Sequence, residues 1–498
     1  MTTPWGTFNF TYDALNHETS VTNPQGEKFN LSYDADGRRV SLNYPNAVQT
    51  NYGYDAASEL TQIIHQKNGT ALAFAEYAYD SDGNRVSMAT PDGTNVYSYD
   101  PLNRLISASH PAPSNLPILN ESFSYDAVGN RLSDASITGY NYNAANELVS
   151  NSSFTYSYDA NGNLISKTDS AGNKTTFSYD SENELIGASM PNGVSAVYKY
   201  DALGRRIFKS TGSLPSQTQQ FVYDNQNILA ILDGNNNLIA LFTHGPGIDE
   251  PLEIRQGNGT EYFLHADGLG SIVAATDING NVVEKIEYES YGQPVFLDVR
   301  GPSPVIESQS FTQSPFAFTG REWDEETGLY DNRARYYDPQ SGRFTTQDPL
   351  SIFGGINYYQ YALNIPTKFT DPLGLSVAFF DPCNGLLAII SLGTLYEFPA
   401  QNITTGGYAP IPAGIYSVGP PRENTGGRTG YIPSEGPYFI PINVPGRTGI
   451  GIHGGRMGPS SPTHGCIRTT NQSLRSILST IYDANKDPIS SITVIPCK

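Results

Sequence analysis

The chain has 498 residues, a formal net charge of −20, and abundant glycine (48), proline (34) and tyrosine (33). The negative charge argues against nucleic acid as the main partner, because binding to phosphates requires clustered lysine and arginine side chains. Hydrophobic residues make up 38% of the chain, which is enough for a folded core and argues against disorder. Tyrosine and glycine together favour many short strands joined by tight turns.

The charge is unevenly distributed along the chain. Residues 376–498 hold six acidic and eight basic side chains, whereas the residues before them hold 43 acidic and 21 basic ones. This difference predicts two domains, an acidic body and a slightly basic C-terminal domain. It also fits an acidic container around a basic cargo, an arrangement that long-range electrostatics favours.

A Tyr-Asp dipeptide recurs at intervals of mostly 20 to 26 residues. It begins at Tyr12, Tyr33, Tyr54, Tyr79, Tyr99, Tyr125, Tyr158, Tyr179, Tyr200 and Tyr223, with a degenerate copy at Tyr142. Each copy combines an alternating apolar and polar stretch with a turn-forming pair such as Asp-Gly or Gly-Asn, which predicts a β-hairpin. A single hairpin cannot bury its apolar face, so the hairpins are expected to stack into one long, coiling antiparallel sheet. An ordinary β-propeller or β-sandwich is the alternative.

These units, such as YDADGRR and YDALGRR, resemble the YD repeats of Rhs proteins, toxin-complex C components and teneurins. The resemblance covers about residues 8–375 and includes the closing signature FTGREWDEETGLYDNRARYYDPQSGRFTTQDPL. It implies that residues 1–375 form a hollow shell around a C-terminal toxin in residues 376–498. A shell of this length is expected to be either a fragment of a longer one or a shell that a partner chain closes.

The segment NIPTKFTDPLGL, at residues 364–375, matches the P-x-x-x-x-D-P-x-G-L pattern of the same family. The resemblance implies a self-cleavage region at about 318–375, with cleavage between Leu375 and Ser376. The family's cleavage machinery resembles an aspartic protease, in which acidic side chains activate water with help from an arginine.

Arg335 and Asp348 match the arginine and the downstream aspartate of that machinery. Where the family often has a second aspartate, this chain has Tyr336, and the nearby Asp338 is the candidate substitute. Two carboxyl groups can divide the acid and base roles only if one of them has a raised pKa. The alternative is that Arg335 and Asp348 are structural residues of turns.

Residues 376–498 contain apolar runs separated by proline and glycine. LLAIISLG, GIYSVG, YFIPINV, IGIHG and SITVIP predict the short strands of a small β-rich domain. The segment 469–486 predicts one helix, because Leu474, Ile477, Leu478 and Ile481 recur at helical spacing.

The three cysteines of the chain, Cys383, Cys466 and Cys497, all lie in this domain. Cys383 and Cys497 could form a disulfide in an oxidising compartment, and the sequence leaves this open. Cys466 follows His464 by two residues and His453 by 13. An imidazole partner activates a thiol as a nucleophile. A metal site is not expected, because no third or fourth ligand is evident, and no cofactor is expected either.

The segment GIHGGRMGPSSPTHGCIR resembles the signature of the YkuD-type L,D-transpeptidases, a His-Gly followed by Ser/Thr-His-Gly-Cys. The resemblance makes Cys466 the nucleophile, His453 the general base and the Gly454 carbonyl the group that orients it. The remaining roles are oxyanion stabilisation by His464 and the backbone N–H groups of Gly465 and Cys466, and pairing of Arg468 with a substrate carboxylate.

Together these features predict an antibacterial polymorphic toxin that acts on peptidoglycan stem peptides. Transfer of the acyl group to water, to a D-amino acid or to another stem would give L,D-carboxypeptidase, exchange or 3-3 cross-linking activity. The alternatives are a cysteine protease or acyltransferase with a protein target, and a non-enzymatic adhesion or recognition protein.

The expected partners are stem peptides, an immunity protein and a secretion or delivery partner. No apolar run reaches the roughly 18 residues that span a membrane, and the first residues, MTTPWGTFNF, lack a signal-peptide pattern. We therefore expect secretion or delivery by a specialised system and action in the periplasm of the target cell.

Overall fold

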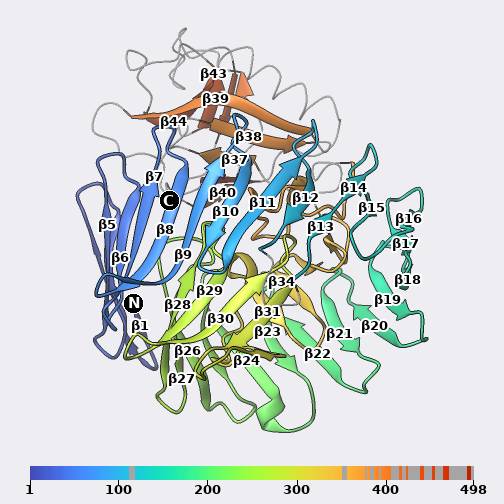
Figure 1. The fold of residues 1–498 in the computed structure, drawn as a ribbon, viewed down its shortest axis with the longest axis horizontal. Helices are drawn as coiled ribbons and strands as arrows, with labels where there is room; N and C mark the ends of the chain where they lie inside the picture. The colour runs from blue at the N-terminus through green and yellow to red at the C-terminus, as the bar shows by residue number, and fades with distance from the viewer. Residues whose placement is uncertain are drawn as a thin grey trace.

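A computed structural model describes residues 1–111, 118–349 and 356–375 together with their side chains, and the backbone of nine strands between Ala378 and Val494. The shell region consists of antiparallel β-sheets (Figure 1). None of the helices in the described part of the chain is long and apolar enough to cross a membrane.

The first sheet has 11 strands, and each strand pairs with its neighbour in sequence. The strands are β3 (Asn9–Tyr12), β4 (Glu18–Thr22), β5 (Lys28–Tyr33), β6 (Arg39–Asn43), β7 (Val48–Tyr54), β8 (Leu60–Lys67), β9 (Thr70–Tyr79), β10 (Arg85–Thr90), β11 (Gly93–Tyr99), β12 (Leu105–Ser109) and β13 (Glu121–Ser122). Two short hairpins lie outside it, β1 (Thr2–Thr3) with β2 (Gly6–Thr7) and β14 (Ser124–Tyr125) with β15 (Arg131–Ser133).

The second sheet has 17 strands, again in sequence order. They are β16 (Asn141–Tyr142), β17 (Leu148–Ser150), β18 (Phe154–Tyr158), β19 (Leu164–Asp169), β20 (Lys174–Tyr179), β21 (Leu185–Ser189), β22 (Ser195–Tyr200), β23 (Arg206–Ser210), β24 (Thr218–Asp224), β25 (Asn227–Leu232), β26 (Leu238–His244), β27 (Pro251–Gln256), β28 (Glu261–Ala266), β29 (Ile272–Asp277), β30 (Val282–Tyr288), β31 (Pro294–Asp298) and β32 (Val305–Glu307). The 3₁₀ turn η1 (Pro215–Gln217) precedes β24.

The repeat forms hairpins because its aspartate closes the turn. In the second copy the Asp34 carboxylate accepts hydrogen bonds from the backbone N–H groups of Asp36 (3.0 Å) and Arg38 (2.9 Å). The hydroxyl of Tyr33 donates to the Glu18 carbonyl one hairpin earlier, at 2.9 Å. Most copies order their own turn and contact the preceding hairpin in the same way, as at Asp55 and Tyr54, and the sequential pairing of the strands confirms the predicted stacking of hairpins.

The repeat sheet is interrupted on both sides of the short hairpin β14–β15, which differs from the single continuous sheet that the sequence predicts. The break lies between β13 and β16, around the degenerate repeat at Tyr142. There Asp134 accepts a hydrogen bond from the Tyr140 hydroxyl at 2.6 Å, and the strands are only two or three residues long. A loop stabilised by side chains therefore takes the place of a full-length strand.

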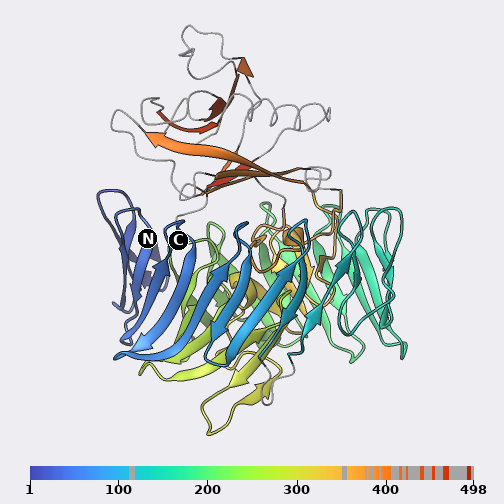
Figure 2. The same ribbon diagram turned by 45° about the horizontal axis from the view of Figure 1, so that its top comes forward.

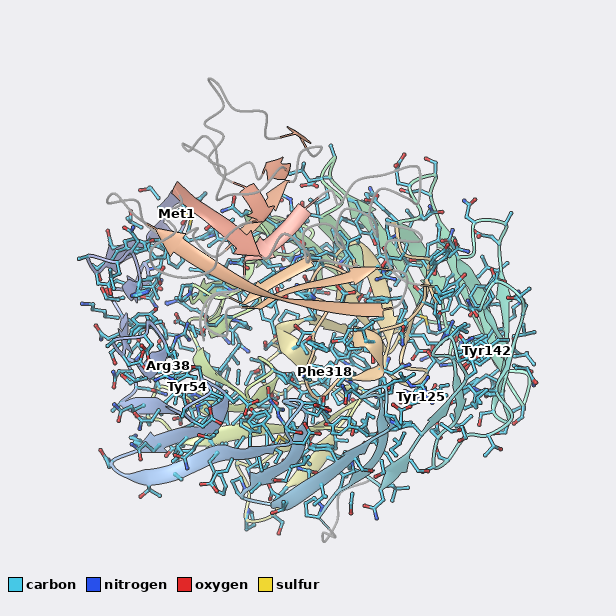
Figure 3. The ribbon with its side chains drawn as sticks, turned by 90° about the horizontal axis from the view of Figure 1, so that it is seen from above. Met1, Arg38, Tyr54, Tyr125, Tyr142 and Phe318 are labelled. Carbon is cyan, nitrogen blue, oxygen red and sulfur yellow. The ribbon has the colours of Figure 1, made fainter. Side chains whose placement is uncertain are left out.

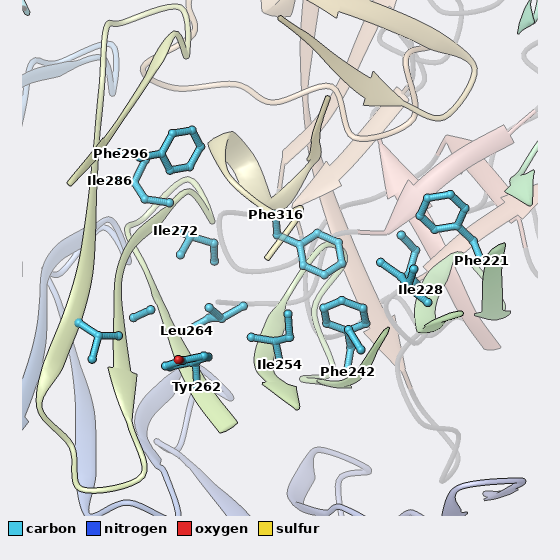
Figure 4. Packing of buried hydrophobic residues seen from close by; sticks show 14 residues of the cluster. Phe221, Ile228, Phe242, Ile254, Tyr262, Leu264, Ile272, Ile286, Phe296 and Phe316 are labelled. Carbon is cyan, nitrogen blue, oxygen red and sulfur yellow. The ribbon is translucent and has the colours of Figure 1, made fainter. Parts of the chain in front are cut away.

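The two sheets share a buried core, and Figure 2 shows their strands facing each other. Phe29 of the first sheet packs against Phe263 of the second, with ring centroids 6.0 Å apart. The hydroxyl of Tyr44 donates to the Leu264 carbonyl across the same junction, at 2.9 Å. A second apolar cluster, drawn in Figure 4, fills the second sheet around Phe242, whose ring lies 5.2 Å from that of Phe316.

The residues after β32 form a small closing module, defined here as residues 316–349 and 356–375. It contains the four-stranded sheet β33 (Glu322–Asp324), β34 (Leu329–Asn332), β35 (Arg335–Asp338) and β36 (Arg343–Phe344), with the 3₁₀ turns η2 (Phe318–Gly320) and η4 (Ala362–Asn364). In Figure 3, Phe318 of this module appears between the labelled residues of the first sheet and Tyr142 at the start of the second. All four strands are largely buried.

Buried ion pairs fix the closing module to the second sheet. Arg206 of β23 is 2% exposed. Its guanidinium donates to Glu322 at 2.7 Å and to Asp324 at 2.5 Å, and it lies 3.3 Å from Asp331. Lys209 on the same strand also pairs with Asp324, at 2.7 Å. Because these charged side chains are removed from water, each needs an oppositely charged partner at close range. This requirement specifies how the module docks on the second sheet.

The C-terminal domain is a nine-stranded sheet in the order β40-β45-β37-β38-β39-β44-β43-β42-β41. Its strands are β37 (Ala378–Asp381), β38 (Leu386–Ser391), β39 (Thr394–Thr404), β40 (Gly414–Ser417), β41 (Arg422–Glu423), β42 (Tyr438–Pro441), β43 (Gly451–Gly454), β44 (His464–Thr469) and β45 (Ser491–Val494). Each of the five apolar runs singled out in the sequence contains a strand. The predicted helix at 469–486 lies outside the described residues except for Thr469, which ends β44.

Candidate functional site

Arg335 is the centre of a buried polar site in the closing module. It is the first residue of β35, its side chain is 1% exposed, and its guanidinium carbon lies 3.5 Å from the centroid of the Phe344 ring. One of its terminal nitrogens, Nη1, donates to the Tyr358 carbonyl at 2.8 Å. The stacked ring and this carbonyl fix the plane of the guanidinium, so the other nitrogens have defined directions.

Two aspartates meet at the same nitrogen of Arg335. Nη2 lies 3.0 Å from Oδ2 of Asp348 and 3.2 Å from Oδ2 of Asp371. The structure thus brings Arg335 and Asp348 together, as the sequence predicts, and adds Asp371 as the second carboxyl group.

Asp338, the expected substitute for the missing aspartate, lies elsewhere. Its Oδ2 is 3.5 Å from Nζ of Lys167 on β19, and its Oδ1 accepts a hydrogen bond from the Gln340 N–H at 2.9 Å. Tyr336, the residue after Arg335, is also turned toward the second sheet, where its hydroxyl accepts from Arg206 at 2.9 Å. The prediction for Asp338 is therefore wrong, because sequence proximity to Arg335 does not bring its side chain to the same face.

The segment from Asp371 to Leu375 forms a tight turn around the Asp371 carboxyl group. The Leu375 N–H donates to Asp371 Oδ1 at 3.0 Å, and the Gly374 N–H donates to the Asp371 carbonyl at 3.3 Å. Arg335 Nε donates to the Gly374 carbonyl at 2.5 Å. Leu375 is thus held beside the Asp371 carboxyl group, which Arg335 joins to Asp348, whereas Ser376 lies outside the described residues.

Only glycine fits at position 374. Its φ of +62° lies in the left-handed region, which other residues rarely adopt. A Cβ there would lie 2.5 Å from the Asn332 carbonyl oxygen and 2.9 Å from the Arg335 nitrogen. The glycine of the P-x-x-x-x-D-P-x-G-L pattern therefore allows the chain to approach Arg335 closely.

Two hydrogen bonds from neighbouring residues of the closing module to backbone carbonyls also support this turn. Asn332 Nδ2 donates to the Asp371 carbonyl at 2.7 Å, and the Ala334 N–H donates to the Leu373 carbonyl at 3.1 Å. Asn332 is 1% exposed. Sequence reasoning did not single out this asparagine, because its contact is made with a segment 39 residues away.

The two carboxyl groups have the arrangement that acid–base chemistry requires. Burial raises the pKa of the Asp371 carboxyl group to about 7, with the Arg335 guanidinium lowering it and the Asp348 carboxylate raising it. A carboxyl group with such a pKa can hold a proton at neutral pH and deliver it to a leaving group. The site therefore combines a proton donor, a second carboxyl group and a fixed cation beside one peptide segment.

The C-terminal domain brings the predicted cysteine and histidine strands side by side. Strands β43 and β44 pair in parallel, with His453 opposite Arg468, and β44 also pairs with β39, with Cys466 opposite Ile403. Successive residues of a strand alternate between the faces of a sheet, so positions 453, 466 and 468 lie on one face. Gly454, His464 and Gly465 belong to the same two strands.

One group of carboxylates in the described part of the chain could hold a metal ion. Ligand atoms of Glu27, Glu253 and Glu261 lie within 4.8 Å of one another. Asn23 donates to Glu253 at 2.9 Å and to Glu27 at 2.8 Å, and Arg255 donates to Glu261 at 3.0 Å. These protein partners account for the cluster without an ion.

Family models match both parts of the chain. The teneurin YD-shell model matches residues 1–115 and 117–367. The chain belongs to the YD-shell family. A second model, the L,D-transpeptidase catalytic domain of the YkuD type, matches residues 386–489. Both resemblances found in the sequence are thereby confirmed.

The curated relatives include a tRNA nuclease and two proteins named as toxins. The tRNA nuclease WapA of Bacillus subtilis is 30% identical over 290 residues, which is 57% of this chain and 11% of WapA. The double-stranded DNA deaminase toxin A of Burkholderia cenocepacia is 27% identical over 58% of this chain and 21% of its own length. Toxin protein Tse5 of Pseudomonas aeruginosa is 44% identical over 115 residues, 23% of this chain and 8% of Tse5. The chain thus spans about a fifth or less of these relatives.

Solved structures share the shell fold. A crystal structure of TcdB2-TccC3-Cdc42 matches with a TM-score of 0.59 and 21% identity, over 74% of this chain and 20% of that chain. TcdB2-TccC3 without the hypervariable C-terminal region matches with a TM-score of 0.58, also at 21% identity and over the same shares of both chains. This confirms the predicted antiparallel YD-repeat shell.

Proposed function

We propose that this protein is an antibacterial toxin whose shell cleaves its own chain after Leu375 and thereby frees residues 376–498, a peptidoglycan-modifying enzyme. The observation that carries the cleavage is the meeting of Arg335, Asp348 and Asp371 beside Leu375. The family models support a domain boundary at this point, since one ends at residue 367 and the other begins at 386.

The cleavage step follows the logic of an aspartic protease. Asp348 acts as the base that removes a proton from water, and the resulting hydroxide attacks the Leu375 carbonyl carbon. Asp371 acts as the acid that protonates the departing nitrogen of Ser376. The Arg335 guanidinium keeps the two carboxyl groups together and offsets their repulsion.

The freed domain acts through a covalent intermediate. His453 takes the proton of the Cys466 thiol, and the sulfur attacks the stem-peptide carbonyl. The bond to the terminal D-residue then breaks, and His453 returns the proton to the departing amine. The N–H groups of Gly465 and Cys466, with His464, stabilise the oxyanion. The Gly454 carbonyl orients His453, and Arg468 binds the substrate carboxylate. Water, a D-amino acid or a second stem then accepts the acyl group.

The register of the C-terminal strands supports these roles. Positions 453, 466 and 468 share one face of two adjacent strands, which suits a base, a nucleophile and a carboxylate-binding cation that act on one substrate. Such a domain needs no cofactor.

The place of action follows from the substrate. Stem peptides lie outside the inner membrane, so the domain acts in the periplasm of a target cell and a delivery partner is required. The producing cell needs an immunity protein for the same reason. Two of the relatives are named as toxins, which supports this setting. The activities named for the relatives concern DNA and tRNA.

Intact-mass measurement of the purified chain tests the cleavage. The wild-type chain is expected to give two masses that correspond to residues 1–375 and 376–498, and Asp348→Asn a single mass. Asp338→Asn is the matched control and is expected to cleave like the wild type. Equal cleavage in the wild type and Asp348→Asn would overturn the assigned role of Asp348.

A further inference from the structure

Asp249 and Glu250 are adjacent residues that contact three different parts of the shell. They lie in the connection between β26 and β27 of the second sheet, directly before Pro251. Asp249 is 7% exposed and has a positive φ of 53°. A buried aspartate in this backbone conformation is costly unless its surroundings hold it there.

The Asp249 carboxylate binds two arginines of the closing module. Oδ1 accepts from Arg321 Nη1 at 2.8 Å and from Arg333 Nη2 at 2.5 Å, and Oδ2 accepts from Arg333 Nη1 at 3.1 Å. The backbone is equally close, because a Cβ on Gly320 would lie 2.1 Å from the Asp249 carbonyl oxygen. The closing module therefore contacts Asp249 through ion pairs with its carboxylate and through close packing of Gly320 against its backbone carbonyl.

Arg333 links Asp249 to the segment Asp371–Leu375, where the proposed cleavage occurs. The nitrogen that binds Asp249 Oδ2, Nη1, also donates a short hydrogen bond to the Pro372 carbonyl. Pro372 is the residue between Asp371 and Leu373. The carboxylate of Asp249 thus fixes the guanidinium that holds the peptide next to the acid of the proposed cleavage.

Glu250 links the same position to the first sheet. Its carboxylate accepts two hydrogen bonds from the guanidinium of Arg39 on β6, the one from Nη2 at 3.0 Å. It also accepts from the Gly247 N–H at 2.8 Å within its own loop. When the first sheet docks on the second, Arg39 orders the loop that presents Asp249.

We infer that Asp249 is a positioning residue for self-cleavage, and that the Asp249–Glu250 dipeptide makes cleavage depend on the docking of the two repeat sheets. The inference rests on the proposed cleavage after Leu375. Asp249 acts through Arg333 and Pro372 and takes no part in the proton transfers. In this arrangement the chain is cut only once the two repeat sheets and the closing module have docked.

The rate of self-cleavage during refolding of the full chain from urea tests the inference. Asp249→Asn is expected to slow cleavage by about tenfold or more, since small displacements of a reacting group have effects of this size. Glu250→Gln and Arg39→Gln are expected to slow cleavage to the same extent as each other, because each removes the ion pair between Arg39 and Glu250. Asp34→Asn is the matched control: it breaks the neighbouring Asp34–Arg38 ion pair, 2.7 Å long, and leaves the rate unchanged.

The pH dependence of the cleavage rate distinguishes a positioning role of Asp249 from a loss of stability in Asp249→Asn. The charged and titratable groups around Asp371 are Arg335, Asp348 and Tyr361, and those around Asp249 are Arg321, Arg333, Tyr361 and His244. Asp249→Asn leaves two guanidinium groups without their carboxylate. The added positive potential favours ionised Asp371, so the alkaline limb of the profile moves to lower pH. A stability defect alone leaves the limb in place.

Arg333→Lys serves as the second variant should Asp249→Asn fail to refold. It keeps the charge but loses the two-pronged contact, so it is expected to cleave slowly with an unmoved alkaline limb. A wild-type rate in Arg333→Lys, or a wild-type rate and limb in Asp249→Asn, would overturn the inference. Failure of the proposed cleavage itself looks different, because the wild-type chain would then stay intact.

Discussion

The raised pKa of Asp371 predicts that the proposed self-cleavage depends on pH in a defined direction. The carboxyl group has a pKa of about 7 in the folded chain, and cleavage requires its protonated form. At pH 7 about half of the molecules carry this proton, and at pH 9 about one in a hundred does. The rate is therefore expected to be highest in mild acid and to fall about 50-fold between pH 7 and pH 9.

The assay is refolding of the urea-unfolded full chain by dilution into buffers from pH 5 to 9. Cleavage is followed by intact mass, and folding is followed in parallel by the fluorescence of Trp5 and Trp323, the two tryptophans of the chain. Asp371→Asn removes the titrating proton and is expected to stay uncut at every pH. Asp338→Asn should reproduce the wild-type profile. A cleavage rate that stays constant from pH 6 to pH 9, with folding unchanged, would refute the assignment of Asp371 as the acid.

Three further predictions concern the turn, the core and the toxin. Gly374→Ala should abolish cleavage, because its Cβ would lie 2.5 Å from the Asn332 carbonyl; intact mass would show it, and efficient cleavage would contradict the account of the turn. Phe263→Ala should lower the free energy of unfolding by about 4 kcal/mol in urea titrations, because Phe263 is fully buried between the sheets. The control is Leu203→Ala, at a residue that is 73% exposed, which should change the free energy of unfolding by less than about 0.5 kcal/mol. Residues 376–498 should slow bacterial growth when exported to the periplasm and not when kept in the cytosol; equal toxicity in the cytosol would favour a protein target.

The repeat sheets could be predicted from the sequence because their signals are local. Most repeat turns are closed by the aspartate of their own Tyr-Asp dipeptide, as at Asp34, and many strands alternate between buried and exposed residues, as β5 does. Neighbouring hairpins then have few ways to pair. The break at Tyr142 was visible as a degenerate repeat, but the loop around Asp134 that replaces the strand depends on a particular hydrogen bond.

The cleavage site could be predicted only in part, because its residues meet through long-range contacts. Arg335 and Asp348 were found by resemblance, and the second carboxyl group was sought next to Arg335 in sequence. Asp371 was present in the quoted D-P-x-G-L pattern, but only the fold shows that it reaches Arg335. Asp249 gave no signal at all, since it lies 84 residues before Arg333.

The central claim is that Cys466 is the nucleophile of an enzyme that acts on peptidoglycan stem peptides, and mass spectrometry of muropeptides tests it most directly. Muropeptides are taken from cells that export residues 376–498 in wild-type form or as Cys466→Ser, with Cys383→Ser and Cys497→Ser as controls. The account predicts shortened, exchanged or 3-3 cross-linked stems in the wild type and both controls, and a loss of at least about 10⁴-fold in rate in Cys466→Ser. Retention of more than about a tenth of the activity in Cys466→Ser would contradict the covalent mechanism.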